Sequence, residues 1–195
     1  RRTIAVHREA FERAGLAQAF GRVIGLVVQP GVEFGNLNVV RYQRTKARGL
    51  SGVLDEEPGL VFEAHSTDYQ TPEALRDLVS DGFAILKVGP GLTFALREAL
   101  YGLDQIAAFL FPEARKQTLA AVTEEVMREE PANWGKYYHG SAEAQRLQRH
   151  FSYSDRIRYY WPHPKVAAAV EELLALLDGV VIAETLISQY LPGNY

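Results

Sequence analysis

The sequence predicts an α/β protein in which short parallel strands alternate with helices over the first half of the chain, with helices alone after that. Three apolar runs, at residues 22–29, 60–64 and 83–88, each end abruptly in polar residues and lead into a helix-like segment. They recur at intervals of about 20 to 35 residues, which is typical of βαβ units with right-handed crossovers. Because parallel strands end at one edge of a sheet, the polar residues that follow them are expected to form a site there.

Each element has its own signal. The first apolar run shows no alternation, as in a strand that is covered on both faces of its sheet. Thr71-Pro72-Glu73 marks a helix start, because it combines a capping hydroxyl, a first-turn proline and an acid facing the helix dipole. Beyond Pro112 the strand pattern stops. Apolar periodicity predicts the helices themselves at residues 4–20, 37–54, 92–111, 114–128, 143–149 and 166–177.

We expect one domain over residues 1–195, with βα units over 1–111 and a mainly helical extension over 112–195. The pattern leaves two architectures open. A small α/β domain with three strands is one. The other is part of a (β/α)8 barrel, which explains equally well why the chain starts on a helix.

Composition excludes several classes of protein. The chain has 195 residues, a net charge of −3 and no cysteine. Structural disulfides, cysteine–zinc sites, iron–sulfur clusters and thiol nucleophiles are therefore excluded. The acidic balance argues against a nucleic-acid partner. No apolar run approaches the ~20 residues that span a bilayer, and no secretory signal is visible. We expect a cytoplasmic protein with no membrane partner.

The strand at 60–64 ends in the candidate catalytic residues Glu63, His65 and Asp68. Positions two apart on a strand share a face, so Glu63 and His65 are expected to point the same way. An imidazole beside carboxylates can bind a divalent metal or transfer protons. The alternative is that His65 is a satisfied histidine at a strand end and that Asp68 serves only the loop.

The next strand ends in Lys87-Val88-Gly89-Pro90-Gly91, which resembles an anion site. Glycine lets backbone N–H groups approach a ligand, and the positive end of the following helix and Lys87 favour a negative charge. The motif is not a Walker A loop, and Pro90 removes one donor. A tight turn between strand and helix is the alternative.

Two further sets of polar residues are candidates. Gln29 and Glu33 follow the first strand and could line a pocket, although a solvated loop is the simpler interpretation of Glu33. Arg156 and Arg158 lie in a segment rich in tyrosine and serine, and they could clamp a phosphate. Alternatively, this segment is a tertiary anchor or an interface.

Long strings of this chain resemble the Z-type subunit of D-tagatose-1,6-bisphosphate aldolase. The resemblance runs from about Thr3 to Tyr195, and long strings are more specific than any short motif above. It rests on Val27 to Phe34, Phe62 to Thr71, Phe83 to Pro90, Leu92 to Ala99, Ser154 to Pro162 and Ile187 to Pro192.

The resemblance implies a TIM barrel related to the metal-dependent class II aldolases, of which this chain would be the C-terminal half with roughly the last three βα units. It implies a non-catalytic subunit that supports a separate zinc-dependent catalytic aldolase subunit in galactitol or N-acetylgalactosamine breakdown. The implied partners are that subunit and a phosphorylated ketohexose, in an oligomer. Whether the full-length protein itself binds zinc is left open.

By the same resemblance, His65 and Ser66 would lie near a metal or phosphate, and the segment from Lys87 to Gly91, with Thr93, near the phosphate. Two other activities are weighed. One is a self-sufficient metal-dependent aldolase. The other is a tagatose-6-phosphate kinase, a label that many family members carry. The chain contains neither a Walker A loop nor the Gly-Ala-Gly-Asp signature of ribokinase-like kinases, which disfavours the kinase.

Overall fold

The protein was analysed as a computed structural model that describes residues 1–114 and 116–193. Its contacts divide the chain into two compact units. The sheet unit comprises residues 1–34 and 39–89, and the helical unit comprises residues 35–38 and the chain from Pro90 onwards. The expected division into βα units and a helical extension at 111/112 stays a prediction. The described chain is mixed α/β, mostly helical, with a small parallel sheet.

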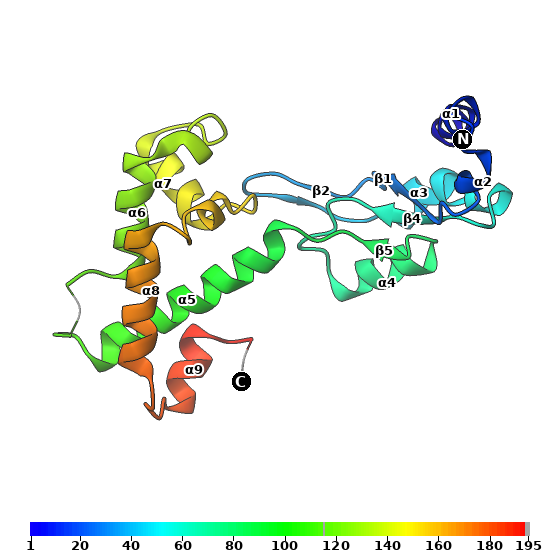
Figure 1. Ribbon diagram of the computed structural model, residues 1–195. Helices are drawn as coiled ribbons and strands as arrows, with labels where there is room; N and C mark the ends of the chain where they lie inside the picture. The colour runs from blue at the N-terminus through cyan, green and yellow to red at the C-terminus, as the bar shows by residue number, and fades with distance from the viewer. Residues whose placement is uncertain (115, 194–195) are drawn as a thin grey trace. The chain divides into compact units, whose positions relative to one another are not determined.

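The sheet unit is built on three parallel strands in the order β1-β4-β5 (Figure 1). Strand β4 is central, and its Glu63 is in register with Val27 of β1 and Ile85 of β5. A two-stranded antiparallel ladder, β2 with β3, forms a separate small sheet. The strands are β1 (Gly25–Val28), β2 (Glu33–Phe34), β3 (Val39–Val40), β4 (Val61–Ala64) and β5 (Ile85–Leu86). The helical elements of this unit are α1 (Arg2–Arg13), α2 (Ala17–Phe20), α3 (Arg44–Ser51), η1 (Leu54–Glu56) and α4 (Pro72–Ser80).

The signal for the start of α4 is confirmed. Thr71 is the N-cap, and its hydroxyl accepts a hydrogen bond from the N–H of Ala74 at 3.2 Å, with Pro72 in the first turn. The helix predicted over 37–54 is shorter, because Val39 and Val40 pair with β2 instead and α3 begins only at Arg44. Paired β-branched residues suit a strand better than a helix.

Within this unit, the helices cover one face of the parallel sheet. Phe62 and Ala64 are fully buried in a core with Ile4 of α1, Ala47 of α3 and Leu78 of α4. On the other face, Val27 is 56% exposed and Ile85 is 39% exposed. The expectation that both faces of the first strand are covered is therefore wrong for the sheet unit. A run of valine and leucine without alternation does not report which face is covered.

The helical unit has a core of its own. Leu119, Met127, Tyr138, Ile157 and Leu173 are fully buried in it. Thr118 and Ser141 cap two of its helices, accepting hydrogen bonds from backbone N–H groups at 3.1 and 3.3 Å. Its elements are α5 (Pro90–Leu110), α6 (Leu119–Glu129), η2 (Pro131–Asn133), α7 (Ala142–Phe151), η3 (Arg156–Tyr159), α8 (Pro164–Leu177) and α9 (Glu184–Tyr190). In the ranges that the structure describes, no helix combines the length and the apolar character needed to cross a membrane.

Candidate functional site

The carboxyl edge of the parallel sheet brings together the segments that follow β4 and β5. The N–H of Lys87 donates to the carbonyl of Ala64 at 3.0 Å, and the Thr67 hydroxyl donates to the carbonyl of Lys87 at 2.8 Å. On the other side, the N–H of His65 donates to the carbonyl of Val28 at 3.0 Å. The expected meeting of strand ends is therefore confirmed for His65 and for the backbone of Lys87.

The loop after β4 is tightly wound. Ser66 and Tyr69 both have left-handed backbone conformations, with φ of 61° and 62°. Non-glycine residues adopt this region at a cost, and such residues cluster at functional sites. The winding turns Asp68 towards the next strand end, where its Oδ1 accepts the N–H of Gly89 at 2.9 Å. Asp68 is buried, so this carboxylate fixes the two strand ends to each other.

That hydrogen bond bears on two predicted roles. The Gly89 N–H, expected to contact a phosphate, donates to Asp68 in this structure. Asp68, expected to be catalytic, performs a structural task. Both roles stay predictions, as does the proposed phosphate loop through Gly91.

The side chains left for chemistry at the ends of β4 and β5 are Glu63, His65 and Lys87. Glu63 and His65 are half-buried, and the His65 Nδ1 lies 3.0 Å from the Ser66 hydroxyl. Lys87 is exposed. An imidazole can take up or release a proton near neutral pH, and an ammonium can stabilise negative charge on a substrate.

The fit of a metal to these residues can be tested on their geometry. Among the residues that the structure describes, no group of three or more histidine, aspartate or glutamate side chains is arranged to hold a metal ion. His65, the predicted metal ligand, has Ser66 rather than a second ligand at its Nδ1. The described residues therefore do not by themselves form the divalent-metal site that the resemblance allows.

Gln29 and Glu33 serve the loop after β1. The Gln29 amide donates to the carbonyl of Val32 at 2.6 Å and to Glu33 Oε2 at 3.0 Å. Glu33 Oε1 also accepts the N–H of Phe34 at 3.0 Å. Both side chains are exposed, and their contacts are local. Their role as pocket residues stays a prediction.

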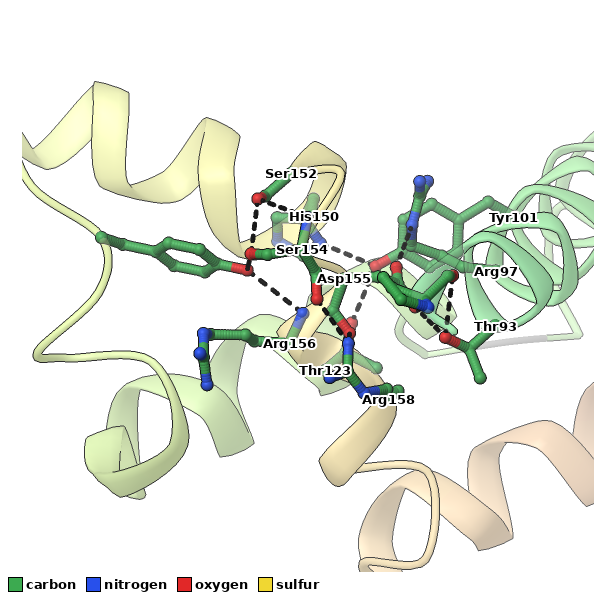
Figure 2. A network of polar contacts seen from close by, with 12 residues as sticks. Thr93, Arg97, Tyr101, Thr123, His150, Ser152, Ser154, Asp155, Arg156 and Arg158 are labelled. Atoms are coloured by element: carbon green, nitrogen blue, oxygen red, sulfur yellow. Dashed lines mark hydrogen bonds and ion pairs between the residues drawn. The ribbon is translucent and has the colours of Figure 1, made fainter. Parts of the chain in front are cut away.

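In the helical unit, Thr93 takes part in a buried polar contact that the sequence did not predict (Figure 2). Its hydroxyl donates to Asp155 Oδ2 at 2.6 Å, and Arg97 Nε donates to Asp155 Oδ1 at 3.3 Å. The Arg97 and Asp155 residues are each 2% exposed. Burial raises the pKa of Asp155 above its ordinary value, against the opposing effects of Thr93 and Arg97. The hydroxyl of Thr93, which was predicted to lie near a phosphate, thus donates a hydrogen bond to the carboxylate of Asp155.

The side chains of Arg156 and Arg158, which are labelled in Figure 2, contact different residues. Arg156 donates to the carbonyl of Asn133 at 2.9 Å, and its guanidinium carbon lies 3.2 Å from the centroid of the Tyr137 ring. Arg158 donates to the carbonyl of Ser154 and, at 2.9 Å, to the hydroxyl of Tyr159. These contacts match the alternative of a tertiary anchor, while a phosphate clamp stays a prediction.

A second polar cluster, also missed, lies between α5, α6 and α7. His150 Nδ1 lies 2.6 Å from the Tyr101 hydroxyl, and its Nε2 lies 3.1 Å from Glu124 Oε2. Arg149 donates to both oxygens of Glu124, at 2.8 and 2.5 Å. The available signal was the spacing of Thr93, Arg97 and Tyr101, which places three polar groups on one stripe of α5.

Comparison with known proteins identifies the family. A model of the family "D-tagatose-1,6-bisphosphate aldolase subunit GatZ/KbaZ-like" matches residues 1–195. A protein of Agrobacterium fabrum (strain C58) named D-tagatose 6-phosphate 4-epimerase is 59% identical over 191 residues, which are 98% of this chain and 45% of that protein. A crystal structure described as a probable tagatose 6 phosphate kinase from Sinorhizobium meliloti 1021 is 77% identical, with a TM-score of 0.97.

The match to that crystal structure takes in all of this chain but only 50% of the other. The chain therefore spans about half the length of the relatives it matches. The match to the family model extends over every residue of the sequence. The chain belongs to the GatZ/KbaZ-like family of D-tagatose-1,6-bisphosphate aldolase subunits.

Proposed function

We propose that the protein containing this chain inverts C4 of a tagatose phosphate, acting as a ketohexose-phosphate 4-epimerase. The observation that carries the proposal is the 59% identity, over 98% of the chain, to a protein named D-tagatose 6-phosphate 4-epimerase. The relative is about twice as long, so this chain would supply part of the site.

The fold that we propose for the whole protein is a (β/α)8 barrel. Its support is the asymmetry of the sheet unit, in which helices cover the face of Phe62 and Ala64 and leave the face of Val27 and Ile85 exposed. A barrel covers its strands with helices on the outside only and fills the inside with side chains from all strands. In this proposal β1 and β5 pair with strands from the remaining length, and Glu63 faces the barrel interior.

The chemistry of the proposed reaction fits the sheet edge. C4 of a 2-ketohexose is β to the carbonyl, so the C3–C4 bond can break when the C4 hydroxyl loses its proton, giving an aldehyde and an enolate. Rotation of the aldehyde and re-formation of the bond on its other face return the proton and invert C4. This is the bond that an aldolase cleaves, which links the epimerase to the family name. His65 and Glu63 are suited to proton transfer, and Lys87 to holding negative charge.

The test is an assay of the full-length protein with D-tagatose 6-phosphate. Formation of fructose 6-phosphate would be followed by a coupled isomerase and dehydrogenase. We expect turnover by the wild type and a loss of about 100-fold or more in His65→Asn, which removes a proton-transfer group. Arg76→Ala, on the exposed side of α4, is the matched control and should keep full activity. A wild type without turnover would refute the proposal.

A second candidate is favoured by the family description, which names an aldolase subunit. Here the protein is an accessory subunit that supports a zinc-dependent catalytic aldolase, within a hetero-oligomer acting on tagatose 1,6-bisphosphate. Mixing the two purified proteins tests it: cleavage that rises only on mixing supports this candidate, and cleavage without any partner supports a self-sufficient aldolase. The kinase hypothesis would require that the full-length protein consumes ATP in the presence of tagatose 6-phosphate.

A further inference from the structure

The helical unit contains a pocket that none of the roles above uses. It has a volume of about 960 Å3 and lies between α5, α6 and α7. Ligand pockets in proteins span roughly 300 to 1,000 Å3, so its size suits a small metabolite. The aromatic rings of Tyr101 and Phe151 and the aliphatic side chain of Leu147 line it, beside the buried imidazole of His150.

The charged side chains that line the pocket differ in whether they have a partner within the described part of the protein. Glu124 is paired with Arg149, and Glu125 and Glu129 are both paired with Lys165, at 2.9 and 3.3 Å. The carboxylate of Glu143 is stabilised by its own backbone N–H and by Ser141, which hold its pKa below the ordinary value. Each of these four acids has a partner within the unit, with one lysine shared between Glu125 and Glu129 and only neutral donors at Glu143.

Two arginines that also line the pocket differ from these acids. Arg128 of α6 and Arg146 of α7 line the pocket, and neither has an ion pair or hydrogen bond from its side chain within the described part of the chain. Arginine side chains bind phosphate and carboxylate groups in paired hydrogen bonds. Two unpaired arginines from neighbouring helices therefore favour an anionic ligand.

The hydrogen bonds of the pocket floor are already satisfied. Burial acts to raise the pKa of Glu124, but hydrogen bonds and charges from Arg149 and His150 outweigh it and hold that pKa below its ordinary value. The Glu124 carboxylate therefore accepts from His150 Nε2. In the neutral imidazole Nδ1 then accepts from the Tyr101 hydroxyl. Tyr101 and His150 therefore present aromatic rings to the uncharged part of a ligand, and the two arginines remain to bind its charged group.

We propose that this pocket binds a small phosphorylated metabolite, with Arg128 and Arg146 holding the phosphate and Tyr101, His150 and Phe151 contacting the body. The site lies wholly within the helical unit and goes beyond the proposed epimerase. A bound anion beside His150 also favours the charged form of the imidazole, which couples the ligand to protonation.

The test is calorimetric titration of the full-length protein with glucose 6-phosphate and with inorganic phosphate. It is done in a Lys87→Ala background, which removes the cation proposed for the sheet edge. We expect the double variant Arg128→Ala/Arg146→Ala to raise the dissociation constant about tenfold or more, since each lost charged hydrogen bond weakens binding by at least that order. Arg76→Ala is the control and should bind as the Lys87→Ala parent does.

A second readout follows the imidazole directly. The NMR signal of His150 is assigned by its absence in His150→Gln. Its titration midpoint should shift to higher pH when glucose 6-phosphate is present, and in the double arginine variant glucose 6-phosphate should leave that midpoint unchanged. Equal affinity in parent and double variant, or no binding by the parent, would overturn the proposal. Because the titration needs no turnover, an inactive protein with arginine-dependent binding separates this site from the epimerase.

Discussion

Thr93 and Asp155 lie 62 positions apart in the sequence, and the Thr93 hydroxyl donates a 2.6 Å hydrogen bond to Asp155 Oδ2. Arg97, one helical turn after Thr93, reaches the other oxygen of the same carboxylate. Asp155 holds a left-handed backbone, with φ of 45°, immediately before η3. A buried ion pair therefore fixes the loop between α7 and η3 to the first turns of α5.

Loss of that carboxylate is expected to destabilise the protein strongly. Asp155→Ala leaves the buried Arg97 charge without its acid, and breaking a buried pair in this way costs about 3 to 5 kcal/mol of unfolding free energy. Urea unfolding measures the change. Asp155→Asn keeps an acceptor for Thr93 and tolerates the left-handed backbone, so it should lose less. Asp178→Ala, at an exposed position, is the control, and an equal effect there would contradict this role.

The stability of the helical unit should depend on pH through His150. Burial lowers the pKa of His150 below its ordinary value, although Glu124 opposes the shift. The unfolded chain then binds a proton at a higher pH than the folded one. The contribution of neutral His150 to the free energy of unfolding is therefore fully present above the unfolded pKa of about 6.5. It is lost as the pH falls from there towards the folded pKa.

Glu124 acts in a lower window, because its pKa is depressed in the fold and its contribution is lost only below the ordinary pKa of a glutamate, about 4.3. Urea unfolding at pH 7.5 and pH 5.5 should thus show a decrease in the wild type that is absent in His150→Gln. His139→Gln, at an exposed position of the same unit, should retain the decrease. A decrease of the same size in His150→Gln would remove His150 as its source.

Substitution by alanine should change the stability of the protein in opposite directions at two helical glycines. A Cβ at Gly102 of α5 would lie 2.5 Å from Leu191 Cδ2 and 2.6 Å from the carbonyl oxygen of Tyr190. Because a backbone atom cannot move aside freely, Gly102→Ala should cost about 1 to 3 kcal/mol despite the better helix propensity of alanine.

At Gly49 of α3 a Cβ would meet no atom within 4 Å, so Gly49→Ala should raise stability by up to about 1 kcal/mol. Thermal unfolding of both variants measures the two effects. Stabilisation by Gly102→Ala would show that α9 does not pack against α5 as described.

The sequence predicted the sheet edge better than it predicted the helical unit. Apolar runs ending in His65 and Lys87 report strand ends directly, because parallel strands share one edge, and the Thr71 cap is a local signal. The contact between Thr93 and Asp155 depends on how α5 packs against η3, which no local pattern reports. The exposure of Val27 was not predicted for a similar reason. The sequence of an apolar strand is the same whether its second face is covered by this chain or by another segment.

Asp68 provides the sharpest test of a predicted catalytic residue against its structural role. Its Oδ1 accepts the N–H of Gly89 at 2.9 Å, which fixes the ends of β4 and β5 beside each other. If this bond is its contribution, Asp68→Asn keeps the acceptor and should retain most of the 4-epimerase activity. Asp68→Ala leaves the Gly89 N–H without this acceptor, so it should lower the free energy of unfolding by about 1 to 3 kcal/mol and reduce the activity with it.

A catalytic carboxylate would behave differently, because asparagine cannot exchange a proton and would lose as much activity as alanine. Steady-state kinetics of the full-length Asp68→Asn and Asp68→Ala proteins decide between the two roles, with Asp55→Ala at an exposed position as the control. A drop of 100-fold or more in Asp68→Asn with unchanged thermal stability would assign Asp68 to the chemistry. Retained activity in Asp68→Asn assigns Asp68 to the structural role and leaves Glu63 and His65 as the candidates for proton transfer around the end of β4.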